Sequence, residues 1–341
     1  MTAPELKGII QKVSTGASLD GEETERVLDL MSSGAATPVQ MGAFLMALRV
    51  RGETVEELTG AARLLRARML PVEAPPDAVD IVGTGGDSHG TYNVSTCAAI
   101  VAAGAGVHVA KHGNRSVSSL SGASDVLSAL GVKVDVGPTV VARAIAQAGL
   151  GFMWAPMHHP AMKQWAPVRA ELGIRTLFNL LGPICNPAGT QRQVLGVFDR
   201  RWLEPIAHVL KNLTAEHVWV VHGADGMDEL TTTGVSHVAE LHDGDITVFE
   251  VTPEHAGLPR ATLADLKGGD ARQNAEAIRG VLRGEPGAFR DIVLLNAAAA
   301  LIVGGKVANL ADGVDRAARS IDGGAASAAL DRLVAVTNDS A

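Results

Sequence analysis

The sequence predicts an α/β protein, in which a small all-helical N-terminal domain precedes a larger α/β domain with a mostly parallel central sheet flanked by helices. Two observations support this class. The N-terminal part carries apolar side chains at helical spacing, and beyond a linker at 71–76 with three prolines, short apolar runs alternate with helical stretches. With 341 residues, 47% of them hydrophobic, the chain is long enough for two domains. We expect a helical domain at 1–72 and a catalytic α/β domain at 77–341.

Recurring capping patterns predict the helices of the N-terminal part. The capping box, in which a polar residue at the helix start is followed three positions later by Glu or Gln, occurs at Thr37 and Gln40 and again at Thr54 and Glu57. Asp20 and Glu23 are expected to start an earlier helix. Proline follows Thr37, at the first position of its helix. That helix then places four apolar residues on one face, namely Met41, Phe44, Leu45 and Leu48.

The alternating pattern of the second domain predicts a parallel sheet with helices on its faces. Short apolar runs predict strands at 79–82, 107–110, 132–136, 152–155, 194–197 and 218–222. Helical stretches lie between them at 95–104, 123–130 and 139–148. An Asp243-Gly244 turn then predicts a hairpin, and helices are expected at 271–283, 287–303 and 325–336.

A second helical stretch, at 160–182, interrupts the α/β pattern. It is polar along one side, and Pro167 is expected to break it. We expect residues 160–185 to pack back onto the N-terminal helices.

Composition limits the classes of partner. The net charge of −8 argues against general nucleic-acid binding, which needs a basic face. Cys97 and Cys185 have no metal-ligand spacing and are typical of a reducing compartment. The N-terminus lacks the apolar core of a signal peptide, and the apolar stretch at 97–110 is too short to span a bilayer. We expect a cytoplasmic protein with neither membrane nor nucleic acid as a partner.

Two donor-rich segments follow predicted strands and suggest a substrate with more than one phosphate. GTGGD at 83–87 can bring backbone N–H groups close to an anion, and NVST at 93–96 opens the next helix with further donors. The dinucleotide fingerprint fails because Ser88 stands where glycine is needed, and no P-loop occurs. A plain tight turn and simple helix capping are the alternatives for these two segments.

KHGNRSVSS at 111–119 adds two cations, Lys111 and Arg115, to a run of donors. It is interpreted as a clamp on phosphate and pyrophosphate, with Arg115 as a planar fork and Lys111 as a point charge. The alternative is a solvated loop.

Asp228 and Glu229 are adjacent carboxylates just after the strand at 218–222. At the edge of a polyphosphate site they would suit Mg²⁺, although adjacent acids on a surface loop are commonly only solvated. Arg169 is a lone cation in the stretch HHPAMKQWAPVRAELG, where a surface position is the alternative to binding a carboxylate.

Taken together, these segments resemble the anthranilate phosphoribosyltransferase family. The resemblance rests on GTGGD, NVST, KHGNRSVSS followed by SGASD, and HHPAMKQWAPVRAELGIRTLFNLLGPICNP. It extends over nearly the whole chain, including ALRVRGET at 47–54 and GGDARQNA at 268–275. It implies transfer of the phosphoribosyl group of phosphoribosyl pyrophosphate to the amine of anthranilate in tryptophan biosynthesis, Mg²⁺ as cofactor, and a homodimer formed through the helical domain.

The resemblance also implies roles for individual residues. Contacts to phosphoribosyl pyrophosphate are implied for Gly83, Gly86, Asp87, Thr91, Asn93, Val94, Ser95, Thr96, Lys111, His112, Gly113, Asn114, Arg115, Ser116, Val117, Ser118, Ser119 and Ala123. Anthranilate contacts are implied for Gly83, Asn114 and Arg169, and Mg²⁺ ligation for Ser95, Asp228 and Glu229. The residues expected to carry catalysis are Lys111, Asn114, Arg115 and Arg169.

This reaction needs no protein nucleophile. Electrostatic stabilisation of the departing pyrophosphate would carry it, and attack of the amine from the opposite face predicts inversion at C1. Two alternatives stay open at this point. A pyrimidine nucleoside phosphorylase would use phosphate and a nucleoside, and a relative without catalytic activity would bind nucleic acid.

Overall fold

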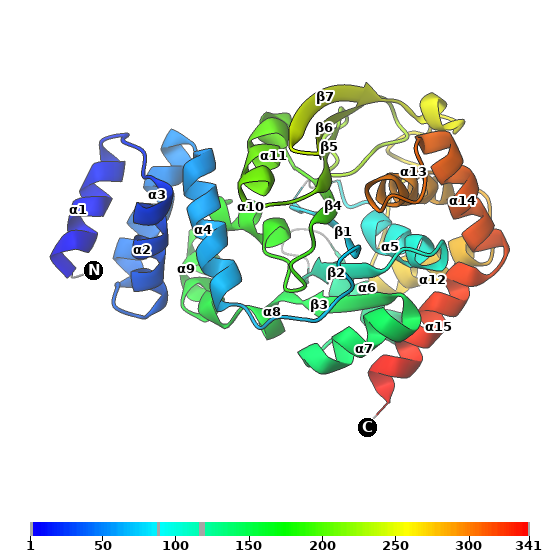
Figure 1. The fold of residues 1–341 in the computed structure, drawn as a ribbon, viewed down its shortest axis with the longest axis horizontal. Helices are drawn as coiled ribbons and strands as arrows, with labels where there is room; N and C mark the ends of the chain where they lie inside the picture. The colour runs from blue at the N-terminus through cyan, green and yellow to red at the C-terminus, as the bar shows by residue number, and fades with distance from the viewer. Residues whose placement is uncertain (1–2, 87–88, 116–119, 340–341) are drawn as a thin grey trace.

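The N-terminal helices form a bundle at one end of the molecule (Figure 1). In the computed structural model, which describes residues 3–86, 89–115 and 120–339, they are α1 Ala3–Ser14, α2 Gly21–Ser32, α3 Pro38–Arg51 and α4 Val55–Arg68. The capping boxes expected at Thr37 and Thr54 are present, and Asp20, expected only to start a helix, forms a third capping box with Glu23. Met41, Phe44, Leu45 and Leu48 are buried, which confirms the apolar face of α3.

One seven-stranded sheet organises the rest of the chain, in the order β3-β2-β1-β4-β5-β6-β7. The strands are β1 Val79–Gly83, β2 Val109–Gly113, β3 Leu150–Trp154, β4 Arg192–Gly196, β5 His217–Gly223, β6 Ser236–His242 and β7 Asp245–Val251. Strands β1 to β5 are parallel, and β6 and β7 are antiparallel additions. The predicted fold class is therefore confirmed, and so is the Asp243-Gly244 hairpin, whose turn residues have φ of 50° and 83°.

Helices cover both faces of this sheet. The remaining helices are α5 Val94–Gly104, α6 Ala123–Ala129, α7 Pro138–Ala148, α8 Ala155–His158, α9 Trp165–Leu172, α10 Leu177–Ile184, α11 Leu203–Asn212, α12 Ala271–Leu282, α13 Ala288–Val303, α14 Leu310–Asp322 and α15 Ala325–Asn338. Short 3₁₀ turns occur at Pro160–Lys163, Arg200–Trp202 and Pro253–Ala256. Alternate residues of β5 point to opposite cores: Trp219 packs with α5 and α13, whereas Val218 and Val220 pack with α11 and the helical bundle.

The strand expected at 132–136 is wrong. The backbone N–H of Val132 is bonded to Leu127 at the end of α6, and that of Lys133 to the hydroxyl of Thr337 in α15. Val132 and Val136 are nevertheless buried, so their apolar character reflects packing of a loop rather than pairing in a sheet.

The second helical stretch packs beside the N-terminal bundle. The indole of Trp165 in α9 is buried and donates to the hydroxyl of Ser32 in α2 at 3.0 Å. The expected break at Pro167 is also wrong, because this proline lies in the first turn of α9, where its missing N–H is not needed. The helix ends instead at Gly173, which has a left-handed φ of 60°.

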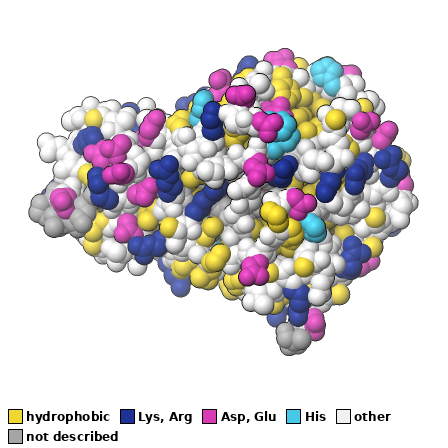
Figure 2. Space-filling view, viewed as in Figure 1, with side chains coloured by type: hydrophobic (Ala, Val, Ile, Leu, Met, Phe, Trp, Pro, Cys, Tyr) yellow, Lys and Arg dark blue, Asp and Glu magenta, His cyan; other side chains and the backbone are white. Residues whose placement is uncertain are grey.

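The molecular surface mixes charges of both signs. Figure 2 shows Lys and Arg side chains interspersed with Asp and Glu side chains over the face drawn. In the described part of the chain, no helix combines the length and the apolar character needed to cross a membrane.

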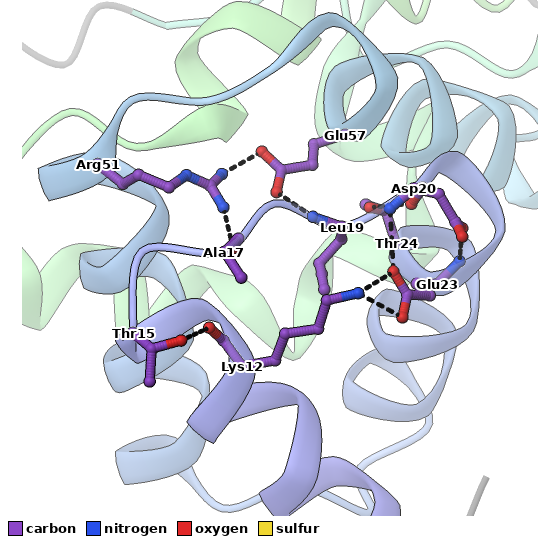
Figure 3. A network of polar contacts seen from close by, with 9 residues as sticks. All are labelled: Lys12, Thr15, Ala17, Leu19, Asp20, Glu23, Thr24, Arg51 and Glu57. Atoms are coloured by element: carbon purple, nitrogen blue, oxygen red, sulfur yellow. Dashed lines mark hydrogen bonds and ion pairs between the residues drawn. The ribbon is translucent and has the colours of Figure 1, made fainter.

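A polar network ties the loop after α1 to the start of α4 (Figure 3). At its centre the buried Glu57 accepts the backbone N–H of Leu19 at 2.9 Å and pairs with Arg51. Arg51 in turn donates to the carbonyl of Ala17 at 2.6 Å. These contacts hold the α1–α2 connection against the bundle.

Candidate active site at the carboxyl edge of the sheet

The loop after β1 lies where the parallel strands end, and it is fixed to the end of β4. The N–H of Thr84 donates to the carbonyl of Gly196 at 2.9 Å, and the Thr84 hydroxyl accepts the N–H of Phe198 at 3.0 Å. Gly85 and Gly86 then take left-handed φ values of 69° and 77°, which favour glycine. The loop therefore turns its backbone toward the edge at which an open α/β sheet binds ligands.

Asp228 packs directly against this loop. Its Oδ2 accepts the N–H of Gly85 at 2.6 Å, and the side chain is almost fully buried. A Cβ at Gly83 would lie 2.3 Å from Asp228 Oδ2, and a Cβ at Gly196 would lie 1.5 Å from the Asp228 carbonyl oxygen. Both glycines are thus required by the close approach of Asp228, which explains Gly83 better than a plain tight turn does.

Glu229 reaches the start of α5. Its Oε1 accepts the N–H of Ser95 at 3.0 Å, in the first turn of that helix, where a carboxylate is stabilised by the helix dipole. The structure thus brings together the predicted metal ligands Ser95, Asp228 and Glu229, although the carboxylates follow Ser95 by more than 130 positions. Neither carboxylate is merely solvated.

Lys111 lies beneath these carboxylates, in β2 rather than in a surface loop. Its ammonium group is buried and donates to the carbonyl of Ile81 and, at 3.4 Å, to the hydroxyl of Ser95. Burial lowers the pKa of Lys111, and the carboxylates of Asp80, Glu229 and Asp228 oppose that shift. A solvated loop is therefore excluded for this residue.

Asp80 is a second buried ionisable group below the site, and it was not predicted from the sequence. It is fully buried in β1, accepts the N–H of His112 at 3.1 Å, and accepts the amide of Asn186 at 2.7 Å. Burial raises its pKa to about 6, against the opposing effects of Lys111 and of these hydrogen bonds. Lys111 and Asp80 thus lie buried below the site and act on each other electrostatically.

The rest of the predicted clamp is only partly described. Arg115 is exposed, its Nε lies 3.7 Å from Asp125 Oδ1, and its guanidinium lies 5.3 Å from the ring centre of Trp154. Asn114 accepts the N–H of Arg115 at 2.8 Å, and Gly113 packs against Phe152 and Ala123. The predicted ligands outside the described residues are Asp87, Ser116, Val117, Ser118 and Ser119.

The start of α5 is tied to distant segments. The side chain of Asn93 makes no cap bond to α5, and instead its Oδ1 accepts from Asn274 at 2.9 Å and from Ser121 at 3.3 Å. Val94 and Thr96 are buried, so contacts to a ligand would come from their backbone. Thr91 forms a single bridge with Lys267. Simple capping by Asn93 is thereby excluded.

The second helical stretch carries two arginines, of which Arg175 contacts the glycine loop. Arg169, in α9, is half-buried with its guanidinium 5.3 Å from the ring centre of Phe178, and burial lowers its pKa. Arg175, which was not predicted, donates to the carbonyl of Gly86 and stacks 4.3 Å from the ring centre of Phe198. Arg175 is a single arginine in the short loop between α9 and α10, and nothing in the sequence around it predicts this contact.

A buried histidine pair lies behind the site. Nε2 of His112 lies 3.3 Å from Nε2 of His159, and Nδ1 of His112 lies 3.1 Å from the carbonyl of Gly182 in α10. Burial, reinforced by the neighbouring His158, lowers the pKa of His159 to about 4, and burial lowers that of His112 well below its ordinary value. Both rings are therefore neutral at physiological pH.

This pair predicts a loss of stability in mild acid. Between pH 6.5 and 4 the unfolded chain protonates His159 whereas the folded chain does not, so the free energy of unfolding falls as the pH falls. Once the pH is below about 4, protonation of His159 in the unfolded chain has lowered the free energy of unfolding by about 3 kcal/mol. Urea denaturation from pH 7.5 to 4.5 should show a shallower decline for His159→Asn than for the parent. The exposed His208→Ala should keep the parental decline, and equal declines for all three proteins would refute the assignment.

The chain is similar to proteins that share one enzymatic activity. The model of the glycosyl transferase family's helical bundle domain matches residues 7–69, and that of its a/b domain matches residues 75–327. The chain is 61% identical over 337 residues to the anthranilate phosphoribosyltransferase of Rhodopseudomonas palustris strain BisB18, covering 99% of each. It is 60% identical over 334 residues to that of Bradyrhizobium diazoefficiens, covering 98% of this chain and 99% of the other.

Solved structures of the same enzyme share the fold. That of Thermus thermophilus has a TM-score of 0.91 and 44% identity, and the match covers 96% of this chain and 98% of the other. The Saccharomyces cerevisiae enzyme in complex with PRPP and Mg has a TM-score of 0.91 and 27% identity, with 98% of each chain covered. The yeast enzyme has also been solved in complex with 4-fluoroanthranilate.

Proposed function

This chain belongs to the anthranilate phosphoribosyltransferases of the glycosyl transferase family, and we propose that the residues gathered at the carboxyl edge of its sheet carry the reaction. The enzyme transfers the phosphoribosyl group of phosphoribosyl pyrophosphate to the amine of anthranilate, giving N-(5-phosphoribosyl)anthranilate and pyrophosphate, in tryptophan biosynthesis. The observation that carries the site assignment is the convergence of Asp228 and Glu229 on the N–H groups of Gly85 and Ser95.

The donor set at this edge fits Mg²⁺. Two carboxylates and a hydroxyl, from Asp228, Glu229 and Ser95, supply only oxygen, which is the ligand type that Mg²⁺ prefers. The yeast relative was solved with PRPP and Mg, which supports the same pairing here. When bound, the ion would offset negative charge on the diphosphate of the donor.

The protein groups around the diphosphate would supply positive electrostatic potential and hydrogen-bond donors. Lys111 holds a buried positive charge within 3.4 Å of the Ser95 hydroxyl, and the first turn of α5 turns its backbone donors toward the same edge. Arg115 extends from the loop after β2, where its planar fork can meet a phosphate. These groups favour the charge that develops as the C1–O bond breaks, and they leave the opposite face of C1 to the amine.

Arg169 is proposed to bind the anthranilate carboxylate. Its guanidinium is held over Phe178 in the same helical stretch that brings Arg175 to the Gly86 carbonyl. We place Asn114 and Gly83 on the same side of the site, since Gly83 ends β1 and Asn114 directly follows β2 at the carboxyl edge. Binding the carboxylate would orient the anthranilate amine toward C1 of the ribose and hold the two atoms close together.

Arg169→Ala is expected to raise the anthranilate KM by roughly tenfold to hundredfold, because a charge-assisted contact to the carboxylate is lost. The KM for phosphoribosyl pyrophosphate should stay within a factor of about three, since no group of the donor is touched. Steady-state kinetics with each substrate varied in turn separates the two effects. The exposed Arg26→Ala serves as control, and an anthranilate KM unchanged in Arg169→Ala would remove this residue from the role.

The activity itself is tested by following anthranilate fluorescence. Loss of the signal on adding phosphoribosyl pyrophosphate and Mg²⁺ is expected, and no loss when a nucleoside and phosphate replace the donor. The second result distinguishes the transferase from the pyrimidine nucleoside phosphorylase. Persistence of the fluorescence with a folded protein would contradict the assignment.

The domain organisation and oligomeric state follow the same proposal. Residues 1–72 would form the helical domain, with 160–185 packed onto it, and 77–341 the catalytic domain. The apolar core shared by α1–α4, α9 and α10 supports the packing of 160–185 on the helical domain, and this core continues into α11 and one face of the sheet. We propose a homodimer through the helical domain, with the exposed Val39 and Val50 of α3 as candidate contact residues. Light scattering of the purified chain should give twice the chain mass, and a monomer at all concentrations would exclude it.

A further inference from the structure

A second cluster of ligating side chains lies at the opposite edge of the sheet. His217 begins β5 and His242 ends β6, and the antiparallel register pairs them directly. Glu240 lies two residues before His242, so it shares that face of the sheet and pairs with Trp219 of β5. Asp228 follows the other end of β5, so on the order of 20 Å of strand separates the two clusters.

The three ligand atoms of this cluster converge. Nε2 of His217 lies 2.8 Å from Oε1 of Glu240, and one ligand atom from each of His217, Glu240 and His242 lies within 4.8 Å of the other two. The rings of His217 and His242 stack with centroids 4.0 Å apart. The cluster is therefore set by strand register and does not depend on a flexible loop.

Burial is graded across the cluster. His217 is 6% exposed and Glu240 half-buried, whereas His242 is exposed. The indole of Trp219 donates to Glu240 Oε1 at 2.8 Å, which orients the carboxylate in the way that outer-shell partners orient metal ligands. The inner two ligands are thus fixed, and the outer one is able to turn about its side-chain bonds.

Two imidazoles and one carboxylate suit a borderline divalent ion and differ from the all-oxygen set at Asp228. Tetrahedral Zn²⁺ with ligands at about 2.0–2.2 Å needs ligand atoms roughly 3.3 Å apart. His217 Nε2 and Glu240 Oε1, now 2.8 Å apart, would separate to that distance as the metal replaces their hydrogen bond. The exposed His242, whose nitrogen lies within 4.8 Å of the other two ligand atoms, would rotate out of its stack to reach the ion. Water would complete the coordination at the solvent side.

We propose that His217, Glu240 and His242 form a binding site for a divalent transition-metal ion of the Zn²⁺ type, joining β5 to β6 and separate from the site of the transferase reaction. The competing arrangement is a plain cross-strand ion pair between His217 and Glu240, with His242 stacked on it. Asp243 Oδ2 lies 3.9 Å from His242 Nε2 and would compete for that ring.

The test is calorimetric titration of the metal-free full-length protein with ZnCl₂ in excess Mg²⁺, which occupies oxygen sites. One equivalent of Zn²⁺ per chain is expected for the parent. His242→Ala and Glu240→Gln should each weaken binding at least tenfold, and His208→Ala, an exposed histidine elsewhere, should bind as the parent does. Bound Zn²⁺ should also raise the unfolding temperature of the parent but not of His242→Ala.

A second readout identifies the ligands. Replacing Zn²⁺ with Co²⁺ should give the visible absorption of a four-coordinate ion in the parent, and that signal should be lost in both cluster variants. Parental Zn²⁺ affinity in His242→Ala and Glu240→Gln, with the variants folded by circular dichroism, would overturn the proposal. If titration of the parent with ZnCl₂ produced no heat of binding, the proposal would be overturned as well. Neither outcome bears on the transferase activity.

Discussion

Replacing Asp228 with Asn and Glu229 with Gln together is expected to lower the kcat/KM for phosphoribosyl pyrophosphate by roughly 10²–10⁴-fold at saturating anthranilate. The amide side chains keep an oxygen that can accept the N–H groups of Gly85 and Ser95, so the loop and the start of α5 should keep their positions. What is lost is the pair of negative charges. A Mg²⁺ ion held by neutral amides is bound far more weakly than one held by carboxylates.

Titration with Mg²⁺ separates this effect from a general loss of activity. The midpoint of activation should move to higher Mg²⁺ in the double variant, and excess Mg²⁺ should restore part of the rate. The single variants Asp228→Asn and Glu229→Gln should fall between the parent and the pair. Asp331→Asn, which removes one exposed carboxylate from α15, should keep the parental titration. An unchanged Mg²⁺ midpoint in the double variant would show that these carboxylates only brace the glycine loop.

Much of the fold could be predicted because its signals are local. The capping boxes at Asp20, Thr37 and Thr54 are satisfied by residues three positions away. Helix α14 was not predicted, and Gly313 inside its sequence has a low intrinsic helix propensity. In the structure a Cβ at Gly313 would lie 2.7 Å from the side chain of Ala298 in α13, so that glycine permits close packing of two helices. Only the tertiary contact explains it.

The site could be predicted because its residues follow the ends of predicted parallel strands. Gly83, Ser95, Asp228 and Glu229 each lie at or beyond the end of a strand of one parallel sheet, and the carboxyl ends of such strands share an edge. Their convergence could therefore be expected without knowing the sheet order.

The residues that were missed reach the site by other routes. Asn186 contacts Asp80 across 106 positions, from the segment after α10, and Arg175 contacts Gly86 across 89. Each lies in a connection between elements, where amide and guanidinium side chains are ordinary surface features. Burial distinguishes them, and burial in a connection depends on how the second helical stretch docks against the sheet.

Replacing Glu57 with Ala is expected to lower the free energy of unfolding by about 3–5 kcal/mol, which is the largest stability effect predicted for a single side chain here. Glu57 is fully buried, and its two oxygens accept the N–H of Leu19 at 2.9 Å and the N–H of Thr54 at 3.0 Å. It also pairs with Arg51, whose side chain is only 14% exposed (Figure 3). Truncation would leave a mostly buried guanidinium without its counter-ion, and one buried and one part-buried N–H donor without an acceptor.

Glu57→Gln and Glu56→Ala distinguish the buried network from helix effects. Glutamine supplies one acceptor oxygen but turns an NH₂ group toward other donors, so a loss of about 1–3 kcal/mol is expected. Glu56 precedes Glu57 in the same first turn of α4 but is exposed, so Glu56→Ala should change stability by no more than about 0.5 kcal/mol. Urea denaturation of the three variants measures these values. If the free energies of unfolding of Glu57→Ala and Glu56→Ala differed by no more than about 1 kcal/mol, the polar network would contribute little to stability. The α1–α2 connection would then be held in place by apolar packing around Leu19.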